Sequence, residues 1–240
     1  MAISYHISGD LAVNIARGLT AAKSLHKFGA VPAMSQNAGG SVWDVNDTPY
    51  PWSAFDTANN LVVLAVNPAD DGDTIHLYGL DENYNEIEET VTLSSAGDVT
   101  STKVFKRVYR AFYNGETPNT GNIDVQCNNT TVMRITAGKS QTLMAIYTIP
   151  AGYTGLLMKG VASCQGSADG TVDFYVRYFG NNNFRIGHTG EVAGGSVYLY
   201  EFAVPKSIPE KSEIDVTLAI RTNNSRVTAA FDLILIPNQS

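Results

Sequence analysis

Residues 141–158, QTLMAIYTIPAGYTGLLM, decide the fold class of this chain. Two apolar runs, residues 143–149 and 154–158, flank the sequence Pro150-Ala151-Gly152-Tyr153. Proline presets φ for a turn and glycine adopts a positive φ without a Cβ clash, so the segment predicts a β-hairpin. Both runs are apolar on both faces, which is typical of strands inside a sandwich. The sequence therefore predicts a buried β-sheet protein.

The length and the composition favour two β domains. A chain of 240 residues exceeds the usual size of one domain, about 100–150 residues. Its 12 Tyr and 21 Gly, with many Thr, Asn and Val, favour strands joined by frequent turns. We expect an all-β chain of two tandem β-sandwich domains, the second of jelly-roll type, with an N-terminal arm or short helix.

No targeting or membrane signal is recognisable in the sequence. The apolar runs are shorter than the about 18 residues that a membrane helix needs, and MAISYHISGD lacks the features of a signal peptide. Two cysteines, Cys127 and Cys164, are too few for a disulfide framework. We expect free, buried thiols, with a single bridge as the alternative.

The charge is unevenly distributed. The net charge is −7, and residues 28–102 hold twelve acidic residues and no Lys or Arg. Nucleic-acid binding needs clustered Lys and Arg, so we expect no nucleic-acid partner.

Residues 1–40 have a pattern of their own. Leu11, Ile15, Leu19, Ala22 and Leu25 recur at helical spacing, with Asp10 as a possible cap and Gly29 as a possible end. Gly18 weakens the helix, and an extended arm over a neighbouring subunit is an equal alternative.

The two β domains are expected at residues 41–127 and 128–240. In the first, we expect strands at residues 61–66, 74–80, 86–93, 103–113 and 123–127. In the second, alternating apolar residues predict about eight strands, among them residues 172–178, 184–187, 196–202, 213–221 and 227–235. Glu213 and Asp215 fall on the polar face of that alternation.

No catalytic motif is recognisable, so we expect neither an enzyme nor a cofactor. Nucleotide-binding loops are absent, and the sequence G-S-A-D-G at residues 166–170 has Ala168 where a nucleophile elbow has serine. The four histidines are scattered, which argues against a zinc site.

Two groups of carboxylates have a chemical alternative. Asp70, Asp71 and Asp73 could bind calcium, although the pattern departs from an EF-hand loop and favours a solvated turn. Glu86 and Glu88 could serve a glycosidase, although alternation on one strand favours a solvated face.

Two groups of residues are candidates for an interface. Lys103, Lys106, Arg107 and Arg110 form one basic cluster, which would dock an acidic partner or, as we prefer, pair with the chain's own acidic strand at residues 86–89. If Val197 and Leu199 face the core, then three aromatic residues face outward and need a cover: Tyr198, Tyr200 and Phe202.

The chain resembles a group of tailed-bacteriophage virion proteins. The matching segments are Lys27-Phe28-Gly29, Trp43-Asp44, and residues 78–93, 105–113, 120–125, 140–152, 208–216 and 229–236. They follow one another over nearly the whole chain. The group looks like surface components of the particle and is similar to head decoration (cement) proteins.

The resemblance implies a non-enzymatic virion protein that is made in the host cytoplasm and decorates the capsid. Its partners would be the major capsid protein and further copies of itself, with a trimer as one candidate, and no membrane. The alternative is a tail- or collar-associated fibre protein that binds host glycans through residues 179–184, with Tyr178 and Asn182 as contacts.

Overall fold

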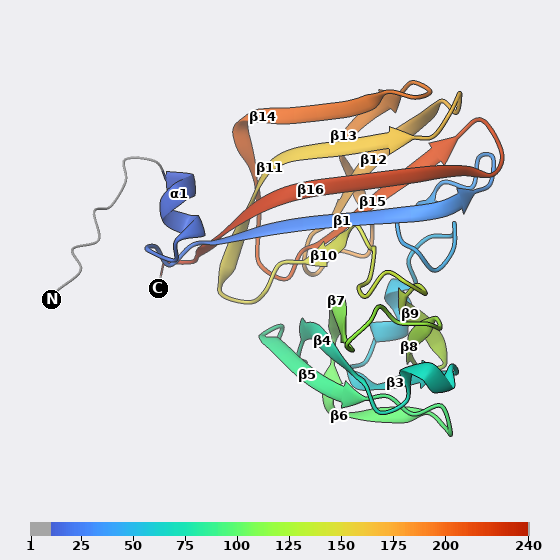
Figure 1. Ribbon diagram of the computed structural model, residues 1–240. Helices are drawn as coiled ribbons and strands as arrows, with labels where there is room; N and C mark the ends of the chain where they lie inside the picture. Colours follow the sequence, from blue (N-terminus) through green and yellow to red (C-terminus); the bar gives the residue numbers. More distant parts are fainter. Residues whose placement is uncertain (1–10, 240) are drawn as a thin grey trace, which may run out of the picture.

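The computed structural model describes residues 11–239 and consists almost entirely of strands (Figure 1). All pairs of named strands are antiparallel, and they form several sheets. The all-β prediction is confirmed. None of the helices in the described range is long and apolar enough to cross a membrane.

Eight strands form a sandwich of two sheets. In one sheet the order is β1 (Lys23–Met34), β16 (Ser225–Pro237), β11 (Tyr153–Cys164), β14 (Val197–Ile208). In the other it is β10 (Ile146–Thr148), β15 (Glu213–Ile220), β12 (Gly170–Arg177), β13 (Arg185–Val192). Numbered along the chain, these orders are 1-8-3-6 and 2-7-4-5, the arrangement of a jelly roll. We call these eight strands the jelly roll.

Period-2 alternation builds the core of the jelly roll. Val172, Phe174 and Val176 of β12 point inward and are buried, as are alternate residues of β16 such as Phe231. The rings of Phe174 and Phe231 meet edge to face across the two sheets, with centroids 5.5 Å apart. Burying each such side chain contributes about 1.5–3 kcal/mol, so this face fixes the strand register.

Residues 43–144 follow β2 (Gly40–Ser41) and precede β10 along the chain, and they form a second core. The short strand β2 pairs with β15. We call residues 43–144 the insert. One of its sheets has the order β6 (Val99–Phe105), β3 (Asn59–Ala65), β8 (Ile123–Cys127), β9 (Thr130–Ile135). The other sheet has the order β5 (Glu86–Thr92), β4 (Thr74–Leu80), β7 (Arg107–Asn114). The insert also contains two short 3₁₀ helices, η1 (Trp52–Phe55) and η2 (Pro68–Asp70).

The N-terminal segment differs from the helix or arm expected over residues 1–40. The helix α1 covers only Leu11–Ala16, and Gly18 (φ 67°) follows it in the left-handed conformation that ends many helices. Residues 23–34, including Leu25 and Gly29, instead form β1, the first strand of the jelly roll. Asp10, the expected cap, lies outside the described residues.

The expected boundary between residues 127 and 128 falls inside a hairpin. β8 and β9 pair across Asn128 and Asn129, which both have a positive φ (50° and 58°). A two-residue turn of this kind suits asparagine because its side chain tolerates the left-handed region. The chain returns to the jelly roll only beyond Met144, whose backbone bridges that of Trp43.

Two expected strand arrangements are also wrong. Residues 143–149 and 154–158 do not form a hairpin, because the turn at Ala151 and Gly152 (φ 78°) carries the chain from β10 in one sheet to β11 in the facing sheet. Residues 103–113 are not one strand, because the chain changes sheets at Lys106 between β6 and β7. Alternation alone indicates strands but not their partners.

Candidate functional site

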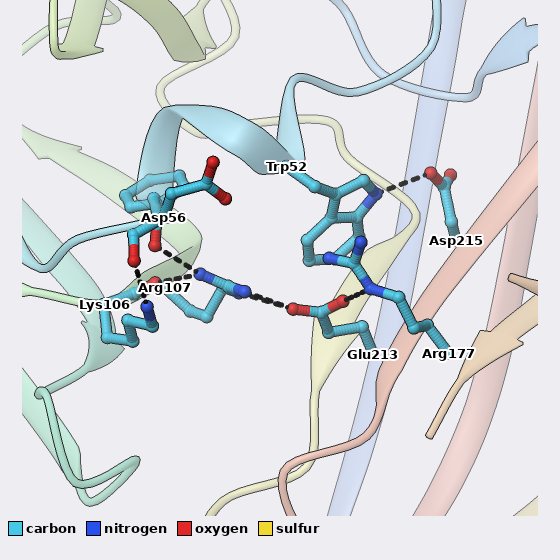
Figure 2. Close-up of polar contacts among 8 residues, drawn as sticks. Trp52, Asp56, Lys106, Arg107, Arg177, Glu213 and Asp215 are labelled. Carbon is cyan, nitrogen blue, oxygen red and sulfur yellow. Dashed lines mark hydrogen bonds and ion pairs between the residues drawn. The ribbon is translucent and has the colours of Figure 1, made fainter. Parts of the chain in front are cut away.

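A buried ion cluster joins the insert to the jelly roll (Figure 2). Arg107, the first residue of β7, donates from Nε to Oε1 of Glu213 at 2.7 Å, and its Nη2 donates to the same oxygen. Its Nη1 donates to the backbone carbonyls of Phe55, at 3.1 Å, and Lys106, at 2.6 Å. Each nitrogen of the guanidinium therefore has at least one acceptor, and we call this contact region the junction.

Glu213, the first residue of β15, accepts hydrogen bonds from two arginines. Its Oε2 accepts from Nε of Arg177, which ends β12. The carboxylate is almost wholly buried, and two guanidinium groups compensate the cost of removing it from water. The cluster thus ties β7 of the insert to two neighbouring strands of the jelly roll.

Asp215 lies two residues further along the same strand face. Its Oδ2 accepts hydrogen bonds from Nε1 of Trp52 and from Oγ of Ser41, both at 2.9 Å. Its Oδ1 has no hydrogen-bond partner among the described residues. Burial raises the pKa of Asp215 to about 6, because the charged form loses its hydration.

The polar face expected for Glu213 and Asp215 is therefore a buried face. Alternation placed both residues correctly on the side away from Ile214 and Val216. It gave no sign that the insert covers that side. Only the two tryptophans in residues 43–52, which need a buried surface, hint that a cover exists.

The four residues of the basic cluster point to different partners. Nζ of Lys103 donates to the backbone carbonyl of Glu88 at 2.7 Å, so Lys103 contacts the acidic strand β5. Lys106 donates to the carbonyl of Asp56 at 2.9 Å, and Arg110 donates to the carbonyl of His26 in β1 at 2.7 Å. With Arg107 buried at the junction, the cluster presents no continuous basic patch.

Two of the three aromatic residues of β14, Tyr198 and Phe202, have the opposite orientation to the expected one, and Tyr200 is 37% exposed. Val197 and Leu199 are 66% and 55% exposed, whereas Tyr198 and Phe202 pack against the jelly-roll core. The β13 and β14 strands end the two sheets, and large rings fill the space between these ends. His188 completes this cluster, with Nε2 2.6 Å from Oη of Tyr198 and its ring stacked on Tyr200 at 3.9 Å.

One side of the jelly roll has two free sheet edges. The edge at β1 is covered by the insert, since Lys27 donates to the carbonyl of Tyr109 and the amide of Ala30 to the carbonyl of Leu143. The edges at β13 and β14, far from the insert in Figure 1, pair with no further described strand. We call the β13–β14 side the open side; it carries these large exposed hydrophobic residues: Ile186, Val197, Leu199, Tyr200 and Val204.

A polar groove of about 270 Å³ lies beside the junction, and we call it the junction groove. Tyr178 and Asn182, the contacts of the glycan-binding alternative, line it together with Phe179 and Lys211. The structure thus brings the loop after β12 next to charged residues that no sequence pattern places there.

The acidic residues have local partners. Asp70 accepts from the amides of Thr120 and Gly121, and Asp71 accepts from the amide of Ser95. Asp73 accepts from Tyr113. Within residues 11–239, no group of three or more His, Cys, Asp or Glu is arranged to hold a metal ion.

The carboxylates considered for glycosidase chemistry are also engaged. Glu86 binds Lys23 at 2.5 Å, and Glu88 lies 3.3 Å from Nε2 of His76. The two cysteines are buried free thiols in separate cores, Cys127 in the insert and Cys164 in the jelly roll.

No protein-family model matches the chain, and the comparison with curated proteins found no match. Similar solved structures include the infectious bursal disease virus Gt strain (9% identity, TM-score 0.21, covering 90% of this chain and 82% of the other). Another is the PBSX exported protein XepA (12% identity, TM-score 0.19, covering 88% and 86%). Likenesses with such low TM-scores carry no argument about this chain.

Proposed function

We propose that this chain is a non-enzymatic structural protein of a phage particle, and that it decorates the head by binding the major capsid protein and further copies of itself. The observation that carries the proposal is the open side, where exposed apolar residues gather along two free sheet edges. The resemblance of the sequence to phage virion proteins supports the identity of the partners.

The open side has the physical features of an association surface. A free edge strand exposes a row of unpaired N–H and C=O groups that another strand can pair with. Val204 is 81% exposed, and it lies in the part of β14 where the register against β11 shifts and the strand bulges. Each docked copy would bury this surface and stabilise the shell by mass action.

Leu199→Glu tests the role of the open side. The charge on an exposed residue is expected to leave the fold intact and to weaken binding to decoration-free capsids at least tenfold, measured by co-sedimentation. Val66→Glu is the matched control, because Val66 is 77% exposed outside the open side. Equal binding by the two variants would contradict the proposed surface.

The copy number in purified virions tests the role itself. Quantitative mass spectrometry against the major capsid protein is expected to give a comparable number of copies. A small multiple of the tail symmetry would instead assign the chain to the collar or a fibre, and absence from the particle would refute both roles.

A second candidate function is glycan recognition by a fibre or adhesion protein. The junction groove favours it, because the loop at residues 178–182 brings an exposed aromatic ring and two asparagines to a concave surface. Saturable binding to host envelope polysaccharide, lost in Asn182→Ala, would support this function.

A further inference from the structure

The junction groove is built from segments that are far apart in the sequence. The loop after β12 and the turn before β15 form one wall, and Asp56, Tyr84 and Arg107 of the insert form the other. Its volume of about 270 Å³ is slightly below that of pockets for drug-sized ligands, about 300–1,000 Å³. The groove therefore suits a small polar unit such as one sugar ring.

Phe179 gives the groove an aromatic surface. It lies at the tip of a turn in which the amide of Asn181 donates to the carbonyl of Tyr178 at 3.0 Å. Gly180 follows with φ 79°, the conformation that a type II turn needs at this position. Phe179 is 60% exposed and its ring meets that of Tyr84 edge to face at 5.7 Å, so the side chain is held in place in an accessible position.

Lys211 is held over this aromatic surface by an unfavourable backbone conformation. Its φ is 60°, in the left-handed region that favours glycine, and its amide donates to the carbonyl of Ile149 at 2.8 Å. The ammonium lies 5.2 Å from the ring centroid of Phe179 and 5.9 Å from that of Tyr84. Strained residues of this kind gather at binding sites, where they position a side chain.

The groove also has polar groups without partners. In the described part of the chain, no hydrogen bond engages the side-chain amides of Asn181 and Asn182 or the ammonium of Lys211. Arg177 lies over the ring of Phe184, 4.7 Å from its centroid, and its Nε donates to Glu213, but among the described residues its two terminal nitrogens have no hydrogen-bond partner. These groups can bind hydroxyls and a carboxylate.

The charge in the groove is locally positive in an acidic protein. Arg107, Arg177 and Lys211 line it against Asp56 and Glu213, while the chain has a net charge of −7. A single carboxylate fits this balance, whereas a long polyanion would be repelled by the acidic insert.

We infer that the junction groove binds a saccharide that carries one carboxylate, such as a terminal uronic acid. The sugar ring stacks on Phe179, Asn181 and Asn182 bind its hydroxyls, and Lys211 and Arg177 bind its carboxylate. This inference rests on the second proposed function, glycan recognition, and names the site and the class of ligand.

The test compares two disaccharides that differ in one group. Cellobiouronic acid carries a carboxylate where cellobiose carries a hydroxymethyl group, and each is titrated into the full chain and followed by two-dimensional NMR. We expect cellobiouronic acid to bind at least tenfold more tightly, with the largest shifts at residues 178–182 and 211.

Two variants locate the binding in the groove. Phe179→Ala and Lys211→Gly are each expected to weaken it at least tenfold, and Lys211→Gly will still fold because glycine suits a φ of 60°. Lys139→Gly is the matched control, since it removes one charge from an exposed turn outside the groove.

Three results would overturn the inference: no binding of either disaccharide, equal binding of both, or binding that Lys211→Gly leaves unchanged. Glycan recognition itself would survive them if host polysaccharide still bound the chain. Loss of polysaccharide binding would refute the second proposed function separately.

Discussion

Asp215 shows how burial at a single residue sets a dependence on pH. Its carboxylate lies under the insert with two donors on one oxygen and none on the other. Burial raises the pKa to about 6, although the hydrogen bonds from Trp52 and Ser41 lower it; the charge of Glu213 raises the pKa further, and that of Arg177 lowers it. The raised pKa means that the folded state holds this proton more tightly than the unfolded state does.

The contribution of Asp215 to the stability of the folded protein is therefore expected to fall as the pH rises from about 4 to about 6. Asp215→Asn removes this contribution and still accepts hydrogen bonds from Trp52 and Ser41. Between pH 4 and pH 6, the free energy of unfolding of the native chain should therefore fall by about 2–3 kcal/mol relative to that of the variant.

Urea unfolding at several pH values measures this shift. Asp44, whose pKa burial also raises to about 6, is present in both proteins and cancels from the difference. A difference in free energy that stays constant from pH 4 to pH 6 would contradict the assignment to Asp215.

Some elements follow directly from the sequence. β4 (Thr74–Leu80) and β8 (Ile123–Cys127) have the bounds expected from their apolar alternation, because each has one buried face and a turn at both ends. β12, β15 and β16 follow the same rule. Local pattern is sufficient for these strands.

Other elements depend on contacts between distant residues, which the pattern does not contain. The sequence pattern predicts a helix or an arm where β1 lies. The strand forms because it pairs with β16, some 200 residues later, and a local pattern does not contain that contact. The same holds for the site residues: the sequence identified Arg107 as basic, but not that Glu213 and Arg177 enclose it. The sequence also identified the aromatic residues of β14 as candidates, but their orientation depends on the space between the edge strands β13 and β14.

Gly29 in β1 marks a close approach between two segments of backbone. A Cβ atom there would lie 2.1 Å from the carbonyl oxygen of Val42 and 2.5 Å from the amide nitrogen of Ala145. Gly29→Ala must displace backbone, and we expect it to lower the free energy of unfolding by about 1–3 kcal/mol or more.

Gly160→Ala is the control for this prediction. Gly160 lies in β11 of the same sheet, and an added Cβ there would meet only the carbonyl oxygen of Ala230 at an ordinary 3.9 Å. Chemical denaturation should separate the two variants clearly. A Gly29→Ala protein as stable as the Gly160→Ala protein would show that the backbone at this point gives way easily.

Over the whole molecule, the two cores are coupled through several contacts, and the ion cluster contributes a buried ion pair to them. Arg107 and Glu213 come from different cores, whereas Arg134 and Asp124 form an ion pair within one sheet of the insert. The first pair is buried and the second is about one quarter exposed, so their contributions to stability should differ.

Arg107→Met leaves the buried Glu213 with Arg177 alone, and we expect a loss of about 3–5 kcal/mol. We also expect the insert and the jelly roll to unfold in two separate calorimetric transitions, because the buried ion pair between them is gone. Arg134→Met should cost about 1 kcal/mol or less and keep the transitions together. A single transition in Arg107→Met would show that packing alone couples the two cores.

The insert begins and ends at the same place on the jelly roll. The amide of Ala145 donates to the carbonyl of Val42 at 2.8 Å, and the backbones of Trp43 and Met144 are bridged. A segment whose two ends are neighbours can be exchanged, shortened or replaced by a tight turn while the eight surrounding strands keep their places. Such an exchange must supply a new cover for Glu213, Asp215 and the edge of β1, and it gives the same eight strands a different surface.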